Sequence, residues 1–158
     1  MSTPTITDLR GQLPIRGEYG RRTLADIEYI VIHHSGVDHD NTAAQIASHH
    51  VVTLGWQGIG YHYVVHQDGA IDRCHDYATI SYHVAGRNRE CLGVCLTGDW
   101  SEREPPEVQI EATRWLVEHI RDAIGWRPVI GHTDVALPGY GTDCPGQTWL
   151  EWRERVDG

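Results

Sequence analysis

One stretch limits the fold of this chain more than any other, the run IEYIVIHHS at residues 27–35. Its apolar residues follow one another without alternating with polar ones, and most of them are β-branched. Such a run is typical of a strand that is buried on both faces. A second apolar run, CLGVCLTGDW at residues 91–100, predicts another strand of this kind. A sheet built from such strands needs cover on both faces.

The rest of the chain alternates between strand and helix patterns. Further strands are predicted at 61–66, 70–73 and 127–131, and Gln67-Asp68-Gly69 is a strong hairpin turn. Helices are predicted at 41–56, from the prolines at 105–106 to Gly125, and at 148–156. We therefore expect an α/β fold in which a central mixed β-sheet is flanked by helices on both faces.

The length of 158 residues suits a single domain with one core. Residues 1–26 show little periodicity, and we expect them to form an N-terminal arm packed on a domain that spans residues 27–158. No internal repeat or low-complexity segment suggests a further boundary.

Charge and hydropathy exclude several classes of partner. The net charge is −9 and the chain has no lysine, which argues against nucleic acid as a partner. No apolar run approaches the roughly 20 residues of a membrane span, so we expect no membrane insertion. The first residues lack the basic and apolar pattern of a signal peptide. We expect synthesis in the cytoplasm, with a separate route of release if the protein acts outside the cell.

The four cysteines do not form an obvious disulfide framework. Cys91 and Cys95 lie four residues apart in a predicted strand, where their Cα atoms would be about 13 Å apart. That separation exceeds the limit of about 7 Å for a disulfide, so both are expected to be buried free thiols. Pairing of Cys74 with Cys91 stays open.

A loop rich in glycine and proline, residues 129–146, gathers side chains that are useful for chemistry. It carries His132, Asp134, Thr142, Asp143 and Cys144. A loop of this composition buries little apolar surface, so its polar groups are more readily explained by chemistry than by packing. The alternative is a surface connection with an incidental cysteine.

His33 and His132 each follow a predicted buried strand, and sites in open sheets gather at the carboxyl ends of strands. Histidine and cysteine are preferred ligands of zinc, and catalytic zinc has three protein ligands and one open position. His33, His132 and Cys144 would supply such a set, with Asp134 as a hydrogen-bond partner of His132. Each histidine taken alone is equally well explained as a structural residue at a strand end.

Four motifs in a fixed order add a resemblance to a known family. IVIHHSG, GIGYHYVVHQDG, SYHVAGRN followed by LGVCLTGDW, and GHTDVALPGYGTDCPG resemble the zinc-dependent N-acetylmuramoyl-L-alanine amidases. That superfamily includes phage-type amidase lysozymes and peptidoglycan recognition proteins. The resemblance covers about residues 27–150 and implies the same fold, with residues 27–158 as an amidase catalytic domain.

The resemblance implies that His33, His132 and Cys144 bind one zinc ion, and that His34 does not bind it. Tyr61 matches a family tyrosine that positions the attacking water or the substrate carbonyl. Thr142 stands where phage-type members carry a catalytic lysine, as in many catalytic recognition proteins. Because threonine supplies no positive charge, its part in proton transfer or in stabilising an oxyanion stays open.

Other residues receive smaller roles. His83 matches a family position near the substrate groove, and Asn88 is chosen on its position alone; both are predicted to contact substrate. His50 and His62 are interpreted as structural, with the side chain of His62 on the opposite face of the sheet from Tyr61. Trp56 would pack in the core or line the groove.

The implied function is hydrolysis of the amide between the lactyl group of muramic acid and L-Ala of peptidoglycan. A monomeric phage endolysin, set free by a separate pore, fits these features. The alternatives are a recognition module that binds peptidoglycan without cutting it, a bacterial wall-recycling amidase, a phage amidase that also binds a polymerase, and an unrelated zinc hydrolase. The intact ligand set favours an enzyme.

Overall fold

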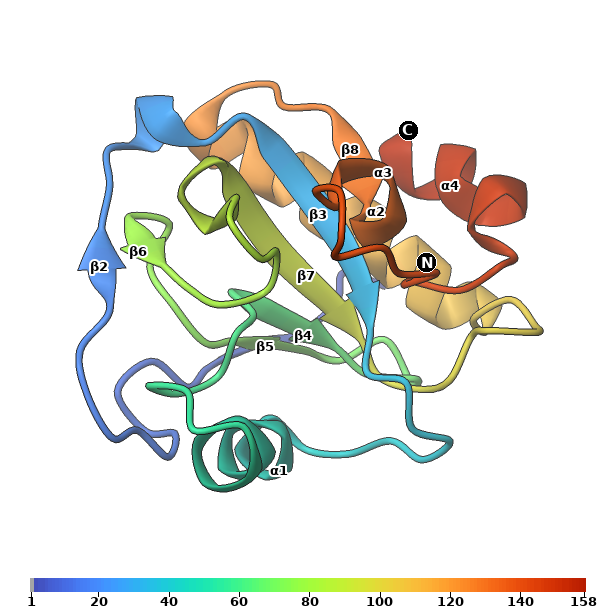
Figure 1. The fold of residues 1–158 in the computed structure, drawn as a ribbon. Helices are drawn as coiled ribbons and strands as arrows, with labels where there is room; N and C mark the ends of the chain where they lie inside the picture. The colour runs from blue at the N-terminus through green and yellow to red at the C-terminus, as the bar shows by residue number, and fades with distance from the viewer. Residues whose placement is uncertain (1) are drawn as a thin grey trace.

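A computed structural model describes residues 2–158 and shows one mixed sheet between layers of helices (Figure 1). The strands of the central sheet are β1 (Ile6–Asp8), β3 (Tyr29–His34), β4 (Tyr63–Val65), β5 (Ile71–Arg73), β7 (Cys91–Leu96) and β8 (Val129–Gly131). Their order is β1-β5-β4-β7-β3-β8, and every neighbouring pair is parallel except β4 and β5. The predicted fold class is confirmed.

Helices lie on both faces of this sheet. The helical elements are η1 (Leu24–Asp26), α1 (Ala43–Ser48), the π-helical turn η2 (His49–Thr53), η3 (Asn88–Glu90), α2 (Glu107–Ile124), α3 (His132–Val135) and α4 (Trp149–Asp157). The core places α2 and α4 against one face, while α1 and α3 pack against the other. A separate two-stranded sheet pairs β2 (Gly20–Arg21) with β6 (Thr79–Ile80).

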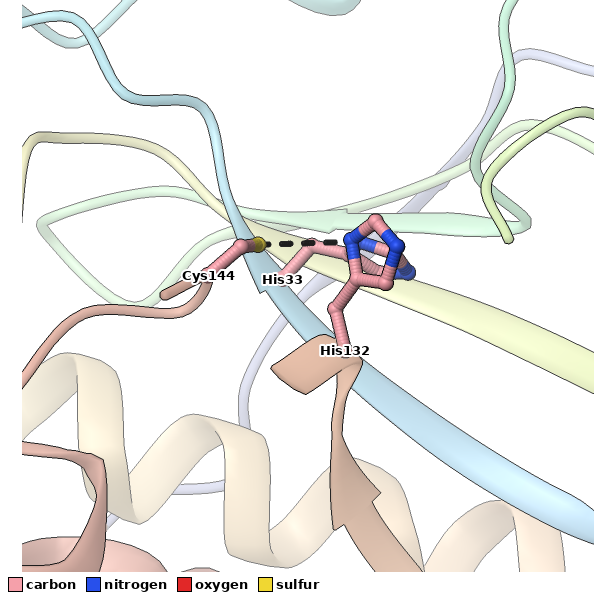
Figure 2. A group of neighbouring side chains, drawn as sticks. All are labelled: His33, His132 and Cys144. Atoms are coloured by element: carbon pink, nitrogen blue, oxygen red, sulfur yellow. Dashed lines mark hydrogen bonds between the residues drawn. The ribbon is translucent and has the colours of Figure 1, made fainter. Parts of the chain in front are cut away.

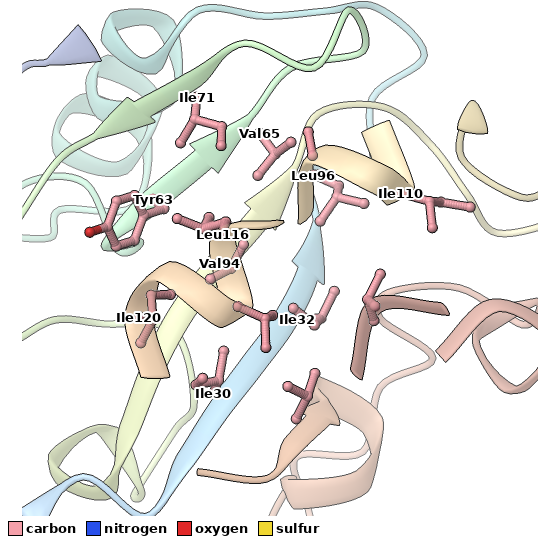
Figure 3. Close-up of a cluster of buried hydrophobic side chains, with 14 of the residues drawn as sticks. Ile30, Ile32, Tyr63, Val65, Ile71, Val94, Leu96, Ile110, Leu116 and Ile120 are labelled. Atoms are coloured by element: carbon pink, nitrogen blue, oxygen red, sulfur yellow. The ribbon is translucent and has the colours of Figure 1, made fainter. Parts of the chain in front are cut away.

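The central strands β3 and β7 send alternate side chains to the two faces, as their pleat requires. On the α2 and α4 face the side chains form the main apolar core, which Figure 3 shows. Its members from these two strands are Ile30, Ile32, Leu92, Val94 and Leu96. They pack on the apolar stripe of α2, including Leu116 and Ile120.

The opposite face of the same two strands is chemically different. Val31 and His33 of β3 lie there, beside Gly93 and Cys95 of β7 in the parallel register. This face is covered by α1, by α3 and by the segment that precedes η3. The candidate site is on this side of the sheet.

The arm at residues 1–26 does more than pack on the domain. Ile6–Asp8 forms β1, which adds to the sheet edge in parallel with β5. The sequence did not predict this strand, because a segment of three residues is too short to show a periodic pattern. Arg22 of the arm is buried and donates to the carbonyl oxygens of Asn88, Arg89 and Cys91. Met1, the first residue of the predicted arm, lies outside the described residues.

Several local predictions can be compared with the structure. The hairpin turn at 67–69 joins the antiparallel strands β4 and β5, with Gly69 at φ +88°. The long amphipathic helix is confirmed as α2 and ends at Gly125, which has φ +87°. The helix predicted at 41–56 is shorter: a capping box between Thr42 and Gln45 starts α1, and η2 completes it.

The segment 76–88, for which the sequence predicts no strand, contains β6, because pairing with β2 of the arm makes a strand of Thr79–Ile80. The pairing of Cys74 with Cys91, which the sequence left open, does not form, since all four cysteines are free thiols. Among residues 2–158, none of the helices combines the length and apolarity needed to cross a bilayer.

Candidate metal centre

Three side chains from distant parts of the chain converge at the carboxyl end of the sheet. His33, His132 and Cys144 each offer one donor atom, and these atoms all lie within 4.8 Å of one another (Figure 2). Cys144 Sγ is 3.7 Å from His33 Nδ1, and the two imidazole centroids are 4.7 Å apart. No other group of three or more such donors occurs in the described part of the chain.

The sheet brings the two histidines together. The sequence predicted that His33 follows the strand. It is instead the fifth residue of β3, because pairing with β7 continues to His34. His132 follows β8 directly and begins α3. Since Ile32 is paired with Gly131, the two histidines leave neighbouring strands side by side. Adjacent parallel strands therefore place two ligands at one edge.

Two backbone hydrogen bonds fix the cysteine beside them. The Thr133 N–H donates to the Cys144 carbonyl at 2.8 Å, which ties the loop to the start of α3. The Cys144 N–H donates to Thr142 Oγ1 at 3.1 Å. His34 takes no part, because its Nδ1 accepts the Trp100 N–H.

The donor set fits zinc. Zinc–nitrogen bonds of about 2.0–2.1 Å and zinc–sulfur bonds of about 2.3 Å put tetrahedral ligand atoms roughly 3.3–3.8 Å apart. The Cys144 to His33 separation of 3.7 Å lies in that range, and since all three donor atoms lie within 4.8 Å of one another, binding needs only a small side-chain adjustment. Three protein ligands leave one position open, as in catalytic zinc sites.

Burial keeps these groups uncharged. It lowers the pKa of His33 well below its usual value, helped by the neighbouring His83, and it also lowers the pKa of His132. Neutral imidazole is the form that binds a metal. Burial raises the pKa of the Cys144 thiol to about 12, so metal binding would release the thiol proton.

Tyr61 lies against one of the candidate ligands. Its ring centroid is 5.1 Å from that of His33 and 5.5 Å from that of His50. Burial raises the pKa of Tyr61 well above its usual value, with the Cys95 and Cys144 thiols adding to the effect. The hydroxyl therefore stays protonated and can donate. His50 is structural, as predicted: its Nδ1 accepts the Gly60 N–H at 2.9 Å.

His62 does not point away from Tyr61 as expected. Its ring lies 6.0 Å from that of His83, on the same side of the sheet as the site. The rule of alternation fails because β4 begins only at Tyr63, so residues 61 and 62 precede the pleated strand. His62 is structural nonetheless, since it accepts the Gly93 N–H and donates to the Thr79 carbonyl.

The residues predicted to contact substrate have protein partners. His83 is buried; its Nδ1 is 2.8 Å from His33 Nε2, and its Nε2 is 3.1 Å from the Cys91 carbonyl. Only the rest of its ring is left to face a ligand. Asn88 Oδ1 accepts the N–H groups of His83 and Val84, which shapes this turn.

Asp134 does not bind His132. Its Oδ2 accepts the Gly131 N–H at 2.8 Å and the Trp149 Nε1–H at 2.9 Å. The carboxylate thereby caps the start of α3 and ties it to α4. Their closeness in sequence favoured a hydrogen bond between Asp134 and His132. The helical turn of α3 instead directs the Asp134 carboxylate back to the Gly131 N–H.

Two hollows lie near the candidate ligands. One of about 410 Å³ is lined by Trp56, Tyr82, His83, Asn88, His132 and Tyr140. Another, of about 340 Å³, is lined by Tyr61, with Ser35, Gln45 and His50 also in its wall. Trp56 lines the first hollow, which is one of its two predicted roles.

Sequence reasoning missed the contact between His83 and His33. One signal was available, the glycine in the middle of a buried strand. Glycine at such a place marks a close approach of another group. A Cβ on Gly93 would lie 2.9 Å from His83 Nδ1, so the imidazole occupies the space that a side chain would take.

Comparison with known proteins identifies a family for this chain. The family described as N-acetylmuramoyl-L-alanine amidase matches residues 23–147. The endolysin of Klebsiella phage KP32 is 29% identical over 106 residues, covering 64% of this chain and 68% of that protein. Peptidoglycan-recognition protein SC2 of Drosophila melanogaster is 25% identical over 159 residues, covering 87% and 83%.

The fold is also that of a solved structure. The endolysin N-acetylmuramoyl-L-alanine amidase LysCS from Clostridium intestinale URNW superposes with a TM-score of 0.79 over 98% of both chains, at 23% identity. At this identity the likeness shows a shared architecture.

Proposed function

The chain belongs to the N-acetylmuramoyl-L-alanine amidase family, and from this premise we propose that it is a zinc-dependent enzyme. Its substrate would be peptidoglycan, cleaved at the amide between the lactyl group of muramic acid and L-Ala. The observation that carries the proposal is the convergence of His33, His132 and Cys144 in zinc-binding geometry.

His33, His132 and Cys144 would hold the ion. When bound, zinc lowers the pKa of a water molecule and polarises the carbonyl that is attacked. The protein's own contribution is to fix the ligands and to supply hydrogen-bond donors for the developing oxyanion.

Tyr61 and Thr142 would be those donors. The raised pKa keeps the Tyr61 hydroxyl protonated, and its ring lies next to that of His33. Thr142 Oγ1 already accepts the Cys144 N–H, so its hydroxyl proton is left to donate. Neither group provides the positive charge of a lysine, so two neutral hydrogen-bond donors would together stabilise the oxyanion.

The two hollows would hold the glycopeptide on either side of the scissile amide. Asn88 lines the larger one and would contact substrate there, since its Oδ1 is engaged but its amide N–H groups donate to no group within residues 2–158. Trp56 and Tyr140 offer the aromatic surfaces of the same hollow.

The test is hydrolysis of purified cell walls by the metal-loaded protein and by Cys144→Ser. The native protein should release free L-Ala amino termini without new reducing sugar ends. Removal of zinc should abolish the activity, and Cys144→Ser should lose most of it. Full activity in the Ser variant or in thoroughly metal-free protein would overturn the proposal.

A recognition module that binds without cutting is the second candidate, supported by the similarity to peptidoglycan-recognition protein SC2. A turbidity assay separates the two, since a module would bind walls and leave them intact. The complete ligand set favours the enzyme.

The similarity to a phage endolysin supports that biological role over a bacterial wall-recycling amidase. The protein would then be made in the cytoplasm and act on the wall after a separate pore opens. Cells that express it should lyse only when their membrane is permeabilised. Lysis without permeabilisation would contradict this placement.

A further inference from the structure

His83 lies between a metal ligand and a backbone carbonyl. Its Nδ1 is 2.8 Å from His33 Nε2, with the two ring centroids 4.9 Å apart in an edge-on arrangement. Its Nε2 is 3.1 Å from the Cys91 carbonyl oxygen. Both of its ring nitrogens are thus hydrogen-bonded within the protein.

The direction of each hydrogen bond follows from one fixed point. A carbonyl oxygen only accepts, so His83 Nε2 carries the proton and donates it to Cys91. A neutral imidazole has one ring proton, so His83 Nδ1 must accept from His33. His33 Nε2 then carries the proton of that ring, and His33 Nδ1 has a free lone pair. That Nδ1 is the atom 3.7 Å from Cys144 Sγ.

We propose that His83 is a positioning residue that holds His33 in the one tautomer able to present Nδ1 to the metal. With the opposite tautomer, a proton on Nδ1 would point at Cys144 and block coordination. Hydrogen bonding of the second ring nitrogen commonly orients metal-bound histidine, usually to a carboxylate, a carbonyl or water. Here the Cys91 carbonyl orients the His83 ring, and His83 in turn orients His33.

The fold holds both His83 and the Cys91 carbonyl in place. The His83 ring lies on the Cα of Gly93, where a Cβ would be 2.9–3.1 Å from three of its atoms. The Cys91 carbonyl is fixed by a 2.8 Å bond from Arg22 of the N-terminal arm. The His83 N–H donates to Asn88 Oδ1 at 2.8 Å. A ring restrained at so many points has little freedom to turn.

The inference rests on the metal binding in the proposed function but not on the reaction. Its test compares two substitutions of similar polarity. His83→Asn puts Oδ1 where Nδ1 was and keeps the acceptor for His33. His83→Gln puts its amide where Nε2 was and removes that acceptor. His75→Gln is the control, because His75 is a neighbouring histidine that binds the Ile59 carbonyl and does not touch His33.

Zinc affinity is measured by competition with a chromophoric chelator, and the His33 tautomer by nitrogen-15 NMR of the metal-free protein. His83→Gln should weaken zinc binding about 10–100-fold and populate the other tautomer of His33, whereas His83→Asn should stay within about threefold of the native protein. His75→Gln should change neither quantity.

Equal zinc affinity and an unchanged His33 tautomer in His83→Gln would overturn the inference. So would an equal loss in the Asn and Gln variants, which would indicate a merely structural role. A native protein that binds no zinc would overturn it together with the metal site. A native protein that binds zinc and shows the predicted difference, but cleaves no peptidoglycan, would refute only the proposed function.

Discussion

The two faces of the central sheet are built from the same strands and differ in almost everything else. Toward α2 and α4, β3 and β7 present isoleucine, leucine and valine, which pack into one continuous core. Toward α1 and α3, they present His33, Gly93 and Cys95 beside smaller apolar clusters. The first face is held by packing and the second by directed hydrogen bonds.

The difference teaches how one small domain supports buried polar chemistry. Buried histidines are tolerated only when each ring nitrogen has a partner. His62 and His83 meet this condition with protein groups at both nitrogens. His33 meets it with His83 at Nε2 and only with the Cys144 thiol, 3.7 Å away, at Nδ1, the atom that a metal ion would bind. The following predictions test this division of roles.

The largest effect is expected on the apolar face. Trp152 of α4 is fully buried and packs edge-on against Trp149. Trp152→Ala should lower the free energy of unfolding by about 3–5 kcal/mol, through lost burial and the cavity that remains. Denaturant unfolding measures this change. Zinc content of the folded fraction should stay at one ion per chain, and its loss would show that the faces are not independent.

Zinc should stabilise the protein through the polar face. At a free zinc concentration about 1,000 times the dissociation constant, the free energy of unfolding should rise by about 4 kcal/mol. Cys144→Ala should lose most of this gain in a thermal or denaturant titration. Cys74→Ala is the matched control, because it removes a buried thiol that is not one of the three donors and should keep the full gain. Equal gains in both variants would contradict the site.

A smaller, pH-dependent effect is expected at the edge of the polar face. His66 bonds Asp72 and Asp40, and these carboxylates raise the pKa of His66 to about 9. Because the pKa is raised in the folded state, protonated His66 stabilises the fold. This stabilisation is fully present at pH values below the unfolded-state pKa of about 6.5, and it is lost as the pH rises through about 9. His66→Gln should therefore cost about 2 kcal/mol at pH 6 and much less near pH 10.

Unfolding curves at the two pH values measure this difference. His119→Gln is the control, since His119 is an exposed residue of α2, and it should change the unfolding free energy little at either pH. A cost of His66→Gln that is the same at both pH values would refute the ionic role of His66.

The smallest effect is expected at Asp134, which joins the two faces. It accepts hydrogen bonds from Gly131 beside the site and from Trp149 of the core. Asp134→Ala should cost about 1 kcal/mol in stability, the usual worth of a lost cap, and should weaken zinc binding because α3 carries His132. Asp143→Ala removes an exposed carboxylate of the same loop and should leave stability nearly unchanged.

Much of the architecture was predictable because its signals are local. Continuous apolar runs marked β3 and β7, a turn sequence marked the β4–β5 hairpin, and helical periodicity marked α2. The grouping of His33, His132 and Cys144 came from strand ends and ordered motifs. By contrast, β1 and β6 are strands only because distant segments pair with them, and no local pattern announces such pairing.

The sequence by itself determined the fold class and the three candidate ligands, since the burial pattern and the type of donor atom both follow directly from the residue types. Only the tertiary structure decided which atoms meet. It turned Asp134 away from His132, put His62 on the side of the site, and set His83 against His33. The physical reason is that a hydrogen bond depends on distance and direction to within a few tenths of an ångström, whereas a hydrophobic pattern depends only on which side of an element is covered.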